Sequence, residues 1–459
     1  MTSSLPVEVA LQIADKALFS STAKHLTNIE LIVLEGALQG KKYQEIAAES
    51  GYNPEYLKNN VGPKLWKLLS ESLGDKVNKN NVVAVLTQQA ASNLGGRNPI
   101  ATTSHSPFSI KQASPKIALE SPHSLVPPTS AFYIKRPPLE ETCYQKLEEP
   151  GALARIKAPS QMGKTSLMLA CLAYARKQRF RTVVLNFQQA DSSVFISLEK
   201  FLHWFCTTLN RKLELPHQVN DYWLKDYGSK SNCTTYLEDC LLSEQNTSIL
   251  LALDQVNELF FYPEIAKDFF SLLRSWHEEA AYGAPSSGLW QKLRLLIIHS
   301  TEVYIPLETN KSPFNVGLAI DLPYFTLEQV EDLSERHGLY LPQGKLEQLM
   351  YLLAGHPYLV RQALYHVARE QTSWEELVRI AATDAGIYRQ HLYKHLGNLQ
   401  QQARLRIAYE QVVRSTVPVQ LEQMLAFQLH SLGLVNICGN AVKPSCELYR
   451  QYFRERLSC

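Results

Sequence analysis

A chain of 459 residues exceeds one ordinary domain of about 100 to 200 residues, so two or three domains are expected. Apolar residues make up 45% of the sequence and charged residues 20%, a balance that excludes a chain disordered throughout. The 46 Lys and Arg against 44 Asp and Glu give a net charge of +2, which argues against a large non-specific nucleic-acid-binding surface.

The eight cysteines are scattered, with no Cys-x-x-Cys pair and no nearby pair of histidines. This pattern predicts reduced thiols of a cytosolic protein. The sequence lacks the basic and apolar segments of a signal peptide, and no run approaches the roughly 18 apolar residues that a membrane span requires. We therefore expect a cytoplasmic protein without membrane contact.

Residues 1–78 predict a small helical domain. A helix over 5–19 carries one apolar stripe, and Thr27 and Glu30 form a capping box at the start of a second helix, which Gly40 ends. The following segment, 42–61, has the helix-turn-helix pattern.

Within that pattern, Asn53 is expected to cap a helix, and Gly62-Pro63 to end it and open another. Residues 79–130 are rich in Ser, Pro, Thr, Asn and Gly and show little hydrophobic periodicity. They predict a flexible linker.

Strands alternate with helices across residues 131–320, which predicts an α/β core: a parallel sheet with helices on both faces. The expected strands are the short apolar runs Leu153–Ala158, Thr182–Phe187, Ser248–Leu253 and Leu293–His299. Residues 321–400 predict a helical lid. Residues 401–459 predict a winged-helix domain, since helices are followed by a hairpin turning at Gly439-Asn440 and a last helix.

The first expected strand leads into a phosphate-binding loop. The pattern G-x-x-x-x-G-K-[ST] is present with Ala158 in the place of its first glycine. The positions expected to bind nucleotide are Pro159, Ser160, Gln161, Met162, Gly163, Lys164, Thr165 and Ser166. Lys164 would neutralise the phosphates and the Thr165 hydroxyl would bind Mg²⁺, so ATP and Mg²⁺ are the expected cofactors. The alternative is a chance string that opens a helix.

A second phosphate-site signal is the apolar run Ser248–Asp254. A strand ending in an acid places a carboxylate beside Mg²⁺, which makes Asp254 the second expected metal ligand; the alternative is a carboxylate that caps a helix. Many such ATPases have Glu next, to orient the attacking water, whereas this chain has Gln255. An amide is a poor general base, so we expect intact binding and slow hydrolysis, with Glu258 either substituting or merely solvated.

The whole chain except the linker resembles the cyanobacterial AAA-like ATPase family related to STAND NTPases, with an N-terminal helix-turn-helix like that of vWA-MoxR-associated proteins. The resemblance is carried by FYIKRPPLEE (132–141), APSQMGKTSLM (158–168), LLALDQVNELF (250–260), HSTEVYIPL (299–307), LPYFTLEQVEDL (322–333), AGHPYLVRQALYHVA (354–368) and ELYRQYF (447–453). Where the family pattern has Gly and Glu, this chain has Ala158 and Gln255.

This resemblance implies further site residues. Tyr133 and Arg136 would lie near the adenine, with Pro357 at the base. Ser300 or Thr301 would sense the γ-phosphate. Arg361 would be a second sensor reaching the phosphates from the lid, or else a surface or packing residue.

The leading functional hypothesis is a nucleotide-controlled regulatory switch that acts through contacts with an unknown protein partner and undergoes nucleotide-dependent homo-oligomerisation. The alternative is a DNA-binding regulator gated by ATP. Residues 26–80 hold seven Lys and seven acidic residues, so their charge cancels and protein docking is favoured. A third hypothesis, a ring-forming mechanochemical ATPase, needs an arginine finger from a neighbouring subunit, which the sequence does not identify.

Overall fold

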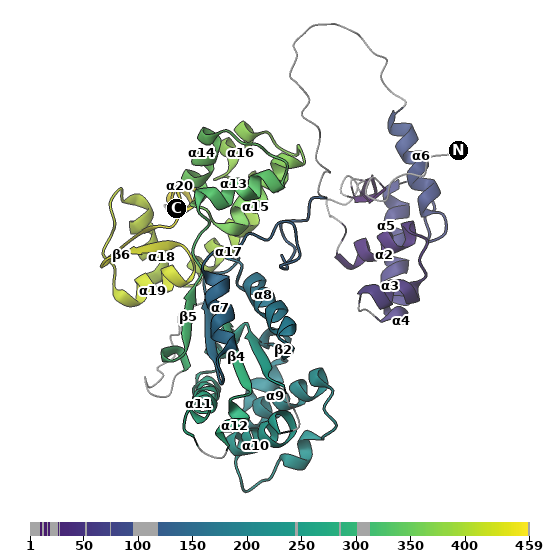
Figure 1. Ribbon diagram of the computed structural model, residues 1–459. Coiled ribbons are helices and arrows are strands. Elements are labelled where there is room, and N and C mark those ends of the chain that lie inside the picture. The colour runs from purple at the N-terminus through teal and green to yellow at the C-terminus, as the bar shows by residue number, and fades with distance from the viewer. Residues whose placement is uncertain are drawn as a thin grey trace. The chain divides into compact units, whose positions relative to one another are not determined.

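The computed structural model describes residues 28–94 and 118–457, apart from 51–52, 74, 244–246, 284–285 and 301–312, together with a few residues between 10 and 26. The chain divides into two compact units, Met1–Lys111 and Gln112–Cys459 (Figure 1). The buried hydrophobic residues of the two units form separate clusters.

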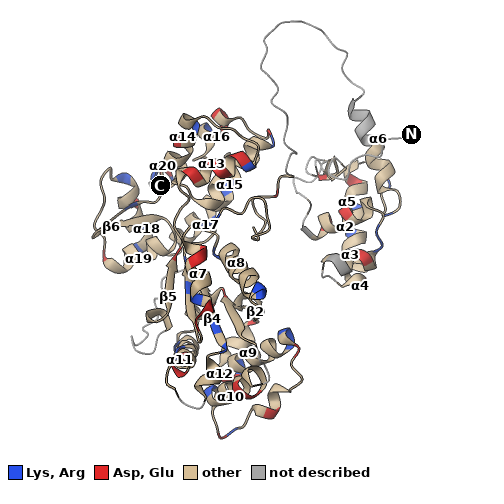
Figure 2. Ribbon diagram, in the orientation of Figure 1, with Lys and Arg blue, Asp and Glu red and all other residues tan. Residues whose placement is uncertain are grey.

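The N-terminal unit is helical throughout its described part. Its core is built from fully buried aliphatic side chains, among them Leu34, Leu57, Leu65 and Leu69. Acidic and basic residues are both spread over its helices (Figure 2). The helices are α2 (Asn28–Leu38), α3 (Tyr43–Ser50), α4 (Pro54–Tyr56), the π-helix η1 (Leu57–Val61), α5 (Gly62–Leu73) and α6 (Val82–Leu94).

Two of the predicted helix ends are confirmed. The side chain of Asn53 accepts hydrogen bonds from the backbone N–H groups of Glu55 and Tyr56, and Gly40 has a φ of +77° just after α2. The capping box cannot be compared, because Thr27 lies outside the described residues.

The prediction that a helix begins at Gly62-Pro63 is confirmed, since α5 begins at Gly62, but no interruption separates it from the preceding helical turn. The π-helical turn η1 passes directly into α5, with Gly62 in the right-handed helical region. Pro63 is the second residue of α5, and a proline is tolerated in the first turn of a helix. One nearly continuous helical segment therefore replaces the two that were expected.

The linker is shorter than predicted, because α6 lies within the stretch 79–130. Val82 and Leu86 are both 0% exposed and belong to the core of the N-terminal unit. Five consecutive apolar residues (VVAVL, 82–86) begin this helix despite the polar composition around them. At the other end, residues 118–130 pack on the C-terminal unit.

The C-terminal unit is built on a parallel sheet, as predicted, with the four expected strands and a fifth that was not expected. Its strands are β1 (Leu153–Lys157), β2 (Arg181–Asn186), β3 (Ile249–Asp254), β4 (Leu293–His299) and β5 (Leu318–Asp321), in the spatial order β2-β3-β4-β1-β5 (Figure 1). Parallel pairing brings the carboxyl ends of β1 and β3, each followed by a predicted phosphate-site motif, to the same edge of the sheet.

Helices cover both faces of this sheet. Alternate strand residues such as Ile156 and Ala252 face α7 and α8, whereas Leu253 and Ile297 face α9, α10 and α11. The covering elements are α7 (Leu139–Glu148), α8 (Lys164–Lys177), α9 (Leu198–Leu213), α10 (Ser229–Tyr236), η5 (Leu237–Leu242), α11 (Pro263–Glu279) and α12 (Ser287–Trp290), with the short 3₁₀ helices η2 (Phe187–Gln189), η3 (Ser192–Ile196), η4 (Val219–Tyr222), η6 (Val256–Phe261) and η8 (Pro313–Asn315).

The remainder of the chain folds around one further core. Residues on both sides of the expected boundary at 400/401 belong to this core. The predicted lid and the predicted winged-helix domain are therefore packed together. The elements are α13 (Leu327–Arg336), α14 (Gln343–Leu353), α15 (Pro357–Ala368), α16 (Trp374–Ile380), α17 (Arg389–Gln400), α18 (Ala403–Arg414), α19 (Gln423–Ser431), β6 (Val435–Cys438), β7 (Ala441–Pro444) and α20 (Glu447–Arg456). The antiparallel pair β6-β7 is the predicted hairpin, and Gly439 at its turn has a φ of +63°.

Along the described parts of the chain, no helix combines the length and the apolar character needed to cross a lipid bilayer.

The packing of α6 gives a stability prediction. Leu86→Ala should lower the free energy of unfolding of the N-terminal unit by about 2 to 5 kcal/mol, because it leaves a cavity in a closed core. Val83→Ala on the same helix removes a side chain that is 41% exposed and should change it by less than about 0.5 kcal/mol. Hydrogen exchange of the slowest amides in α2 and α5 of the full chain measures both, and equal effects would show that α6 does not belong to this core.

Candidate nucleotide-binding site

The loop between β1 and α8 has the backbone of a phosphate-binding loop. Gly163 has a φ of +94°, and Gln161 a φ of +64°. A Cβ on Gly163 would lie 2.8 Å from Nη2 of Arg136, so only glycine fits there. Ala158 is buried and its φ is not positive, so the alanine in the first glycine position causes no strain.

Lys164 opens α8 and its side chain folds back over the loop. Its buried Nζ donates to the carbonyl oxygens of Ala158 and Pro159, each at 2.8 Å. Burial lowers the pKa of Lys164 to about 8; the Asp254 carboxylate opposes this shift and the Lys394 ammonium adds to it. A desolvated ammonium group of this kind gains from an incoming anion.

Asp254 ends β3 and is 5% exposed. Burial raises the pKa of its carboxyl group, while the N–H of Gln255, which donates to Oδ1 at 2.9 Å, and the charge of Lys164 counteract the rise. The backbone of Gln255 has a φ of +58°, which is uncommon for a residue other than glycine. Such strain concentrates at functional positions.

The turn after Gln255 holds two polar residues, Asn257 and Glu258, that line the same cavity. Glu258 accepts a hydrogen bond from Nε2 of Gln188 at 3.0 Å, and Oδ1 of Asn257 accepts from the N–H of Ser300 at 3.3 Å. Ser300 therefore lies at the site, whereas its neighbour Thr301, the other predicted sensor, lies outside the described residues.

Arg136 joins the segment before α7 to the loop. Its Nη2 donates to the carbonyl oxygen of Met162 at 2.7 Å, its Nη1 to that of Pro323 at 3.2 Å, and its guanidinium stacks on Phe325. Burial lowers the pKa of Arg136 to about 10, which leaves it charged near neutrality. The hydroxyl of Tyr133 donates to Glu140 at 3.1 Å.

These elements surround a cavity of about 790 Å³, within the usual size range of small-molecule sites. The predicted residues that line it are Tyr133, Arg136, Ser160, Gln161, Gly163, Lys164, Thr165, Ser166, Gln255, Ser300, Pro357 and Arg361. Three other predicted residues, Pro159, Met162 and Asp254, are not in the lining. The carbonyl oxygens of Pro159 and Met162 accept hydrogen bonds from Lys164 and Arg136, and the Asp254 carboxylate lies near Lys164.

Sequence reasoning missed a second group of lining residues, which comes from α17 and from the end of α19. It consists of Lys394, His395, Asn398, Ser431 and Leu432. The GKT-type loop has a local motif, but these positions have none, and only the fold brings them to the loop. A third group, Pro122 to Val126, belongs to the stretch predicted as linker.

The loop also contacts the helical part directly. Oε1 of Gln161 lies 2.7 Å from Nδ1 of His391, and Nε2 of His391 lies 2.5 Å from the hydroxyl of Tyr449 in α20. Burial lowers the pKa of His391 well below its ordinary value, so the ring is neutral at pH 7, with one nitrogen donating and the other accepting. A hydrogen-bonded chain thus runs from the phosphate-binding loop to the last helix.

Comparison with known families agrees with this geometry. A family model described as an AAA-like domain matches residues 121–455. The chain belongs to the AAA-like domain family. A second model, described as the N-terminal HTH of vWA-MoxR associated proteins, matches residues 5–89, and its range includes most of α6. A search of curated proteins found no match.

The AAA-like domain is also similar to solved structures. The Walker-type ATPase of Pyrococcus abyssi is 15% identical, with 73% of this chain and 100% of that chain covered and a TM-score of 0.53. The Orc1 protein of Aeropyrum pernix, solved in complex with DNA, is 14% identical (74% and 98% covered, TM-score 0.38), and Cdc6p of Pyrobaculum aerophilum 17% identical (73% and 100%, TM-score 0.36). The likeness to the Pyrococcus abyssi protein, whose TM-score exceeds 0.5, shows the fold of the AAA-like domain alone.

The charges in the site predict how Lys164 titrates. Its pKa should lie near 8, Asp254→Asn should lower it further by removing the opposing carboxylate, and Lys394→Gln should raise it by removing a like charge. NMR titration of isotope-labelled lysine, with Lys164→Ala to assign the resonance, measures all three. A Lys164 pKa near the ordinary value for lysine, unmoved by either substitution, would show that the ammonium is not buried beside these two charges.

Proposed function

We propose that the protein is a regulatory switch that binds Mg-ATP in this cavity and hydrolyses it slowly. The observation that carries the proposal is the composition of the cavity wall. The phosphate-binding loop, the start of α15, and the α17 and α19 positions all contribute to it, although they lie far apart in sequence. A ligand in contact with all of them would favour one arrangement of the sheet and the helical part.

The residues present fit Mg-ATP. Gly163 leaves the loop open where a Cβ would collide, and Lys164 and Lys394 bring two cationic side chains to the same end of the cavity. Thr165 and Asp254 are the proposed Mg²⁺ ligands, and oxygen ligands of this kind suit that ion. Tyr133, Arg136 and Pro357 would lie toward the base.

Slow hydrolysis is proposed from the residue after Asp254. Gln255 lines the cavity where an acid would be needed to accept a proton from water, and an amide cannot do so near neutral pH. Glu258 also lines the cavity and is hydrogen-bonded to Gln188, so it is the alternative base. Bound ATP, rather than its turnover, would then be the signal.

Contacts with other proteins would deliver the output. The seven Lys and seven acidic residues of 26–80 cancel, and charge of both signs is spread over the N-terminal helices (Figure 2). We therefore propose that the helix-turn-helix binds a protein partner. We also propose that the protein self-associates in a nucleotide-dependent manner. DNA is the second candidate partner, favoured by the match to a helix-turn-helix family, and gel-shift binding at low salt would favour it over protein docking.

Nucleotide binding is tested by Lys164→Ala, which removes the central phosphate charge but no core side chain. A fluorescent ATP analogue should lose measurable affinity, and the rise in melting temperature that Mg-ATP gives the wild type should vanish. Lys177→Ala, at the exposed far end of α8, is the matched control and should behave as the wild type. Wild-type affinity in Lys164→Ala, or no effect of Mg-ATP on melting or elution of the wild type, would refute the switch.

Hydrolysis is tested at Gln255. Gln255→Glu should raise ATP turnover at least about tenfold with little change in ATP affinity, since general-base assistance is typically worth roughly 10² to 10⁴. Steady-state phosphate release measures turnover. Glu258→Gln separates the alternatives: if the wild type hydrolyses ATP briskly and Glu258→Gln stops it, Glu258 is the base and the stalled state is wrong.

A further inference from the structure

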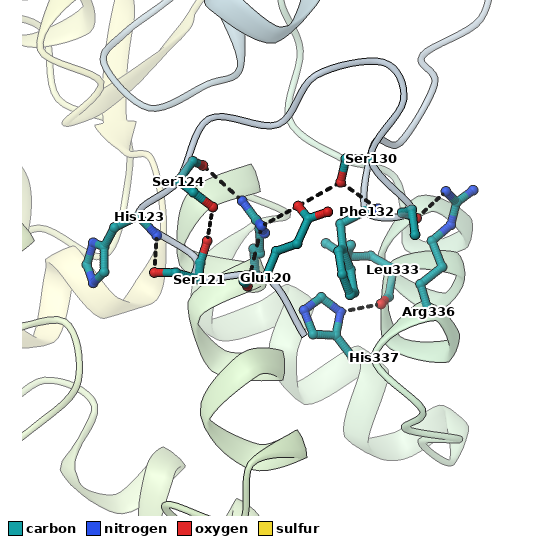
Figure 3. A network of polar contacts seen from close by, with 11 residues as sticks. Glu120, Ser121, His123, Ser124, Ser130, Phe132, Leu333, Arg336 and His337 are labelled. Atoms are coloured by element: carbon teal, nitrogen blue, oxygen red, sulfur yellow. Dashed lines mark hydrogen bonds and ion pairs between the residues drawn. The ribbon is translucent and has the colours of Figure 1, made fainter. Parts of the chain in front are cut away.

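The segment that leads into the AAA-like domain is held on the helical part by polar contacts (Figure 3). We call residues 119–126 the strap. Arg361 of α15 binds it at three points: Nη1 donates to the carbonyl oxygen of Ser124 at 3.2 Å, and Nη2 donates to the carbonyl oxygen and to Oε2 of Glu120 at 3.5 and 3.4 Å. The Glu120 carboxylate also accepts from the Ser130 hydroxyl at 2.8 Å. One arginine therefore anchors both ends of a tight turn.

Further contacts fix the strap against the same helix. Nδ1 of His123 lies 3.0 Å from the hydroxyl of Tyr358, and within the strap the Ser124 hydroxyl donates to the carbonyl oxygen of Ser121 at 2.6 Å. Leu119 and Val126 pack on the core of the helical part. The strap is thus an ordered element of the C-terminal unit rather than free chain.

The Arg361 side chain is buried between α15 and the strap. It is 5% exposed, and its guanidinium lies 5.8 Å from the centre of the Phe132 ring. Its charge is neutralised by Glu120, and its Nη1 and Nη2 donate to strap oxygens, whereas its buried Nε has no hydrogen-bond partner among the described residues. These contacts favour the packing role of Arg361 over that of a phosphate sensor. The cation that faces Lys164 is instead Lys394 of α17.

The strap is also part of the cavity wall. Pro122, His123, Ser124, Leu125 and Val126 all line it, next to Tyr358 and Pro357 at the start of α15. The phosphate end is marked by Lys164, Thr165 and Lys394. The strap therefore lies with the residues assigned to the base.

We propose that the strap closes the base end of the nucleotide cavity, and that Arg361, together with Glu120, is the positioning pair that keeps it closed. The inference rests on the proposed function, because it takes the ligand to be an adenine nucleotide. Since the strap borders the base and not the phosphates, it retains ATP and ADP equally.

Two measurements on the full-length protein test this. The first is hydrogen exchange of residues 118–130 without nucleotide, in the wild type, Arg361→Met and Glu120→Gln. The second is stopped-flow dissociation of ribose-labelled fluorescent ATP and ADP. Both variants should speed exchange in the strap, and dissociation should become about tenfold faster by the same factor for ATP and ADP. Arg361→Lys, which keeps the charge, should recover part of the retention.

Two further variants sharpen the comparison. Arg379→Met breaks an exposed ion pair with Glu376 on α16, away from the cavity, and should change neither measurement. Lys394→Gln should speed the dissociation of ATP more than that of ADP, as expected for a phosphate contact. Glu120→Gln keeps the shape of a half-buried side chain, so it serves if Arg361→Met does not fold.

Each outcome decides the proposal. Faster ATP dissociation with unchanged ADP dissociation in Arg361→Met would make Arg361 a phosphate sensor and overturn the positioning role. Unchanged strap exchange would overturn the pair, and faster exchange with unchanged dissociation would overturn the closure. If the wild type bound neither nucleotide, the proposed function and the closure would both fall, while the exchange data would still decide whether Arg361 and Glu120 hold the strap.

Discussion

The guanidinium of Arg136 lies buried where three parts of the AAA-like domain meet. It donates to the phosphate-binding loop at Met162 and to the start of the helical part at Pro323, and it stacks on Phe325. A buried charge is costly unless its hydrogen bonds are satisfied, so these parts cannot separate without exposing or orphaning it. The same side chain occupies the space beside Gly163, which ties the shape of the loop to the position of the helices.

Several features of the site follow from that constraint. With the helical part held against the loop, Gln161 reaches His391 and through it Tyr449, and Gly433 approaches the ring of Pro159 so closely that a Cβ would lie 2.8 Å from it. Residues of the sheet layer and residues of the helical part therefore both line the cavity. A ligand that bridges such walls changes the relative stability of open and closed arrangements, whether or not it is hydrolysed. This is the physical basis for treating occupancy as the signal.

Local sequence patterns predicted most of the fold but only a minority of the residues that line the cavity. Four apolar runs and the glycine-lysine-threonine loop were found because each is a continuous segment with its own period or motif. The edge strand β5 was missed because it is four residues long and alternately exposed, with Asp321 at its end. Lys394 and the strap were missed for a different reason: their roles depend on contacts between segments more than 200 residues apart, as between Ser124 and Arg361, and no short pattern records such a contact. For Arg361 the sequence left two alternatives, a phosphate sensor and a packing residue, and only the fold shows that its Nη1 and Nη2 donate to the strap.

Hydrogen exchange of the full-length protein with and without Mg-ATP tests most directly whether nucleotide occupancy links the sheet to the helical part. Because the cavity has walls from both, Mg-ATP should slow exchange in α17 and α20 as well as in the loop before α8, and Lys164→Ala should abolish all of this protection together. Protection confined to the loop and the adjoining strand ends, with α17 and α20 unchanged, would contradict the linkage and leave the domain a nucleotide-binding module without a switch.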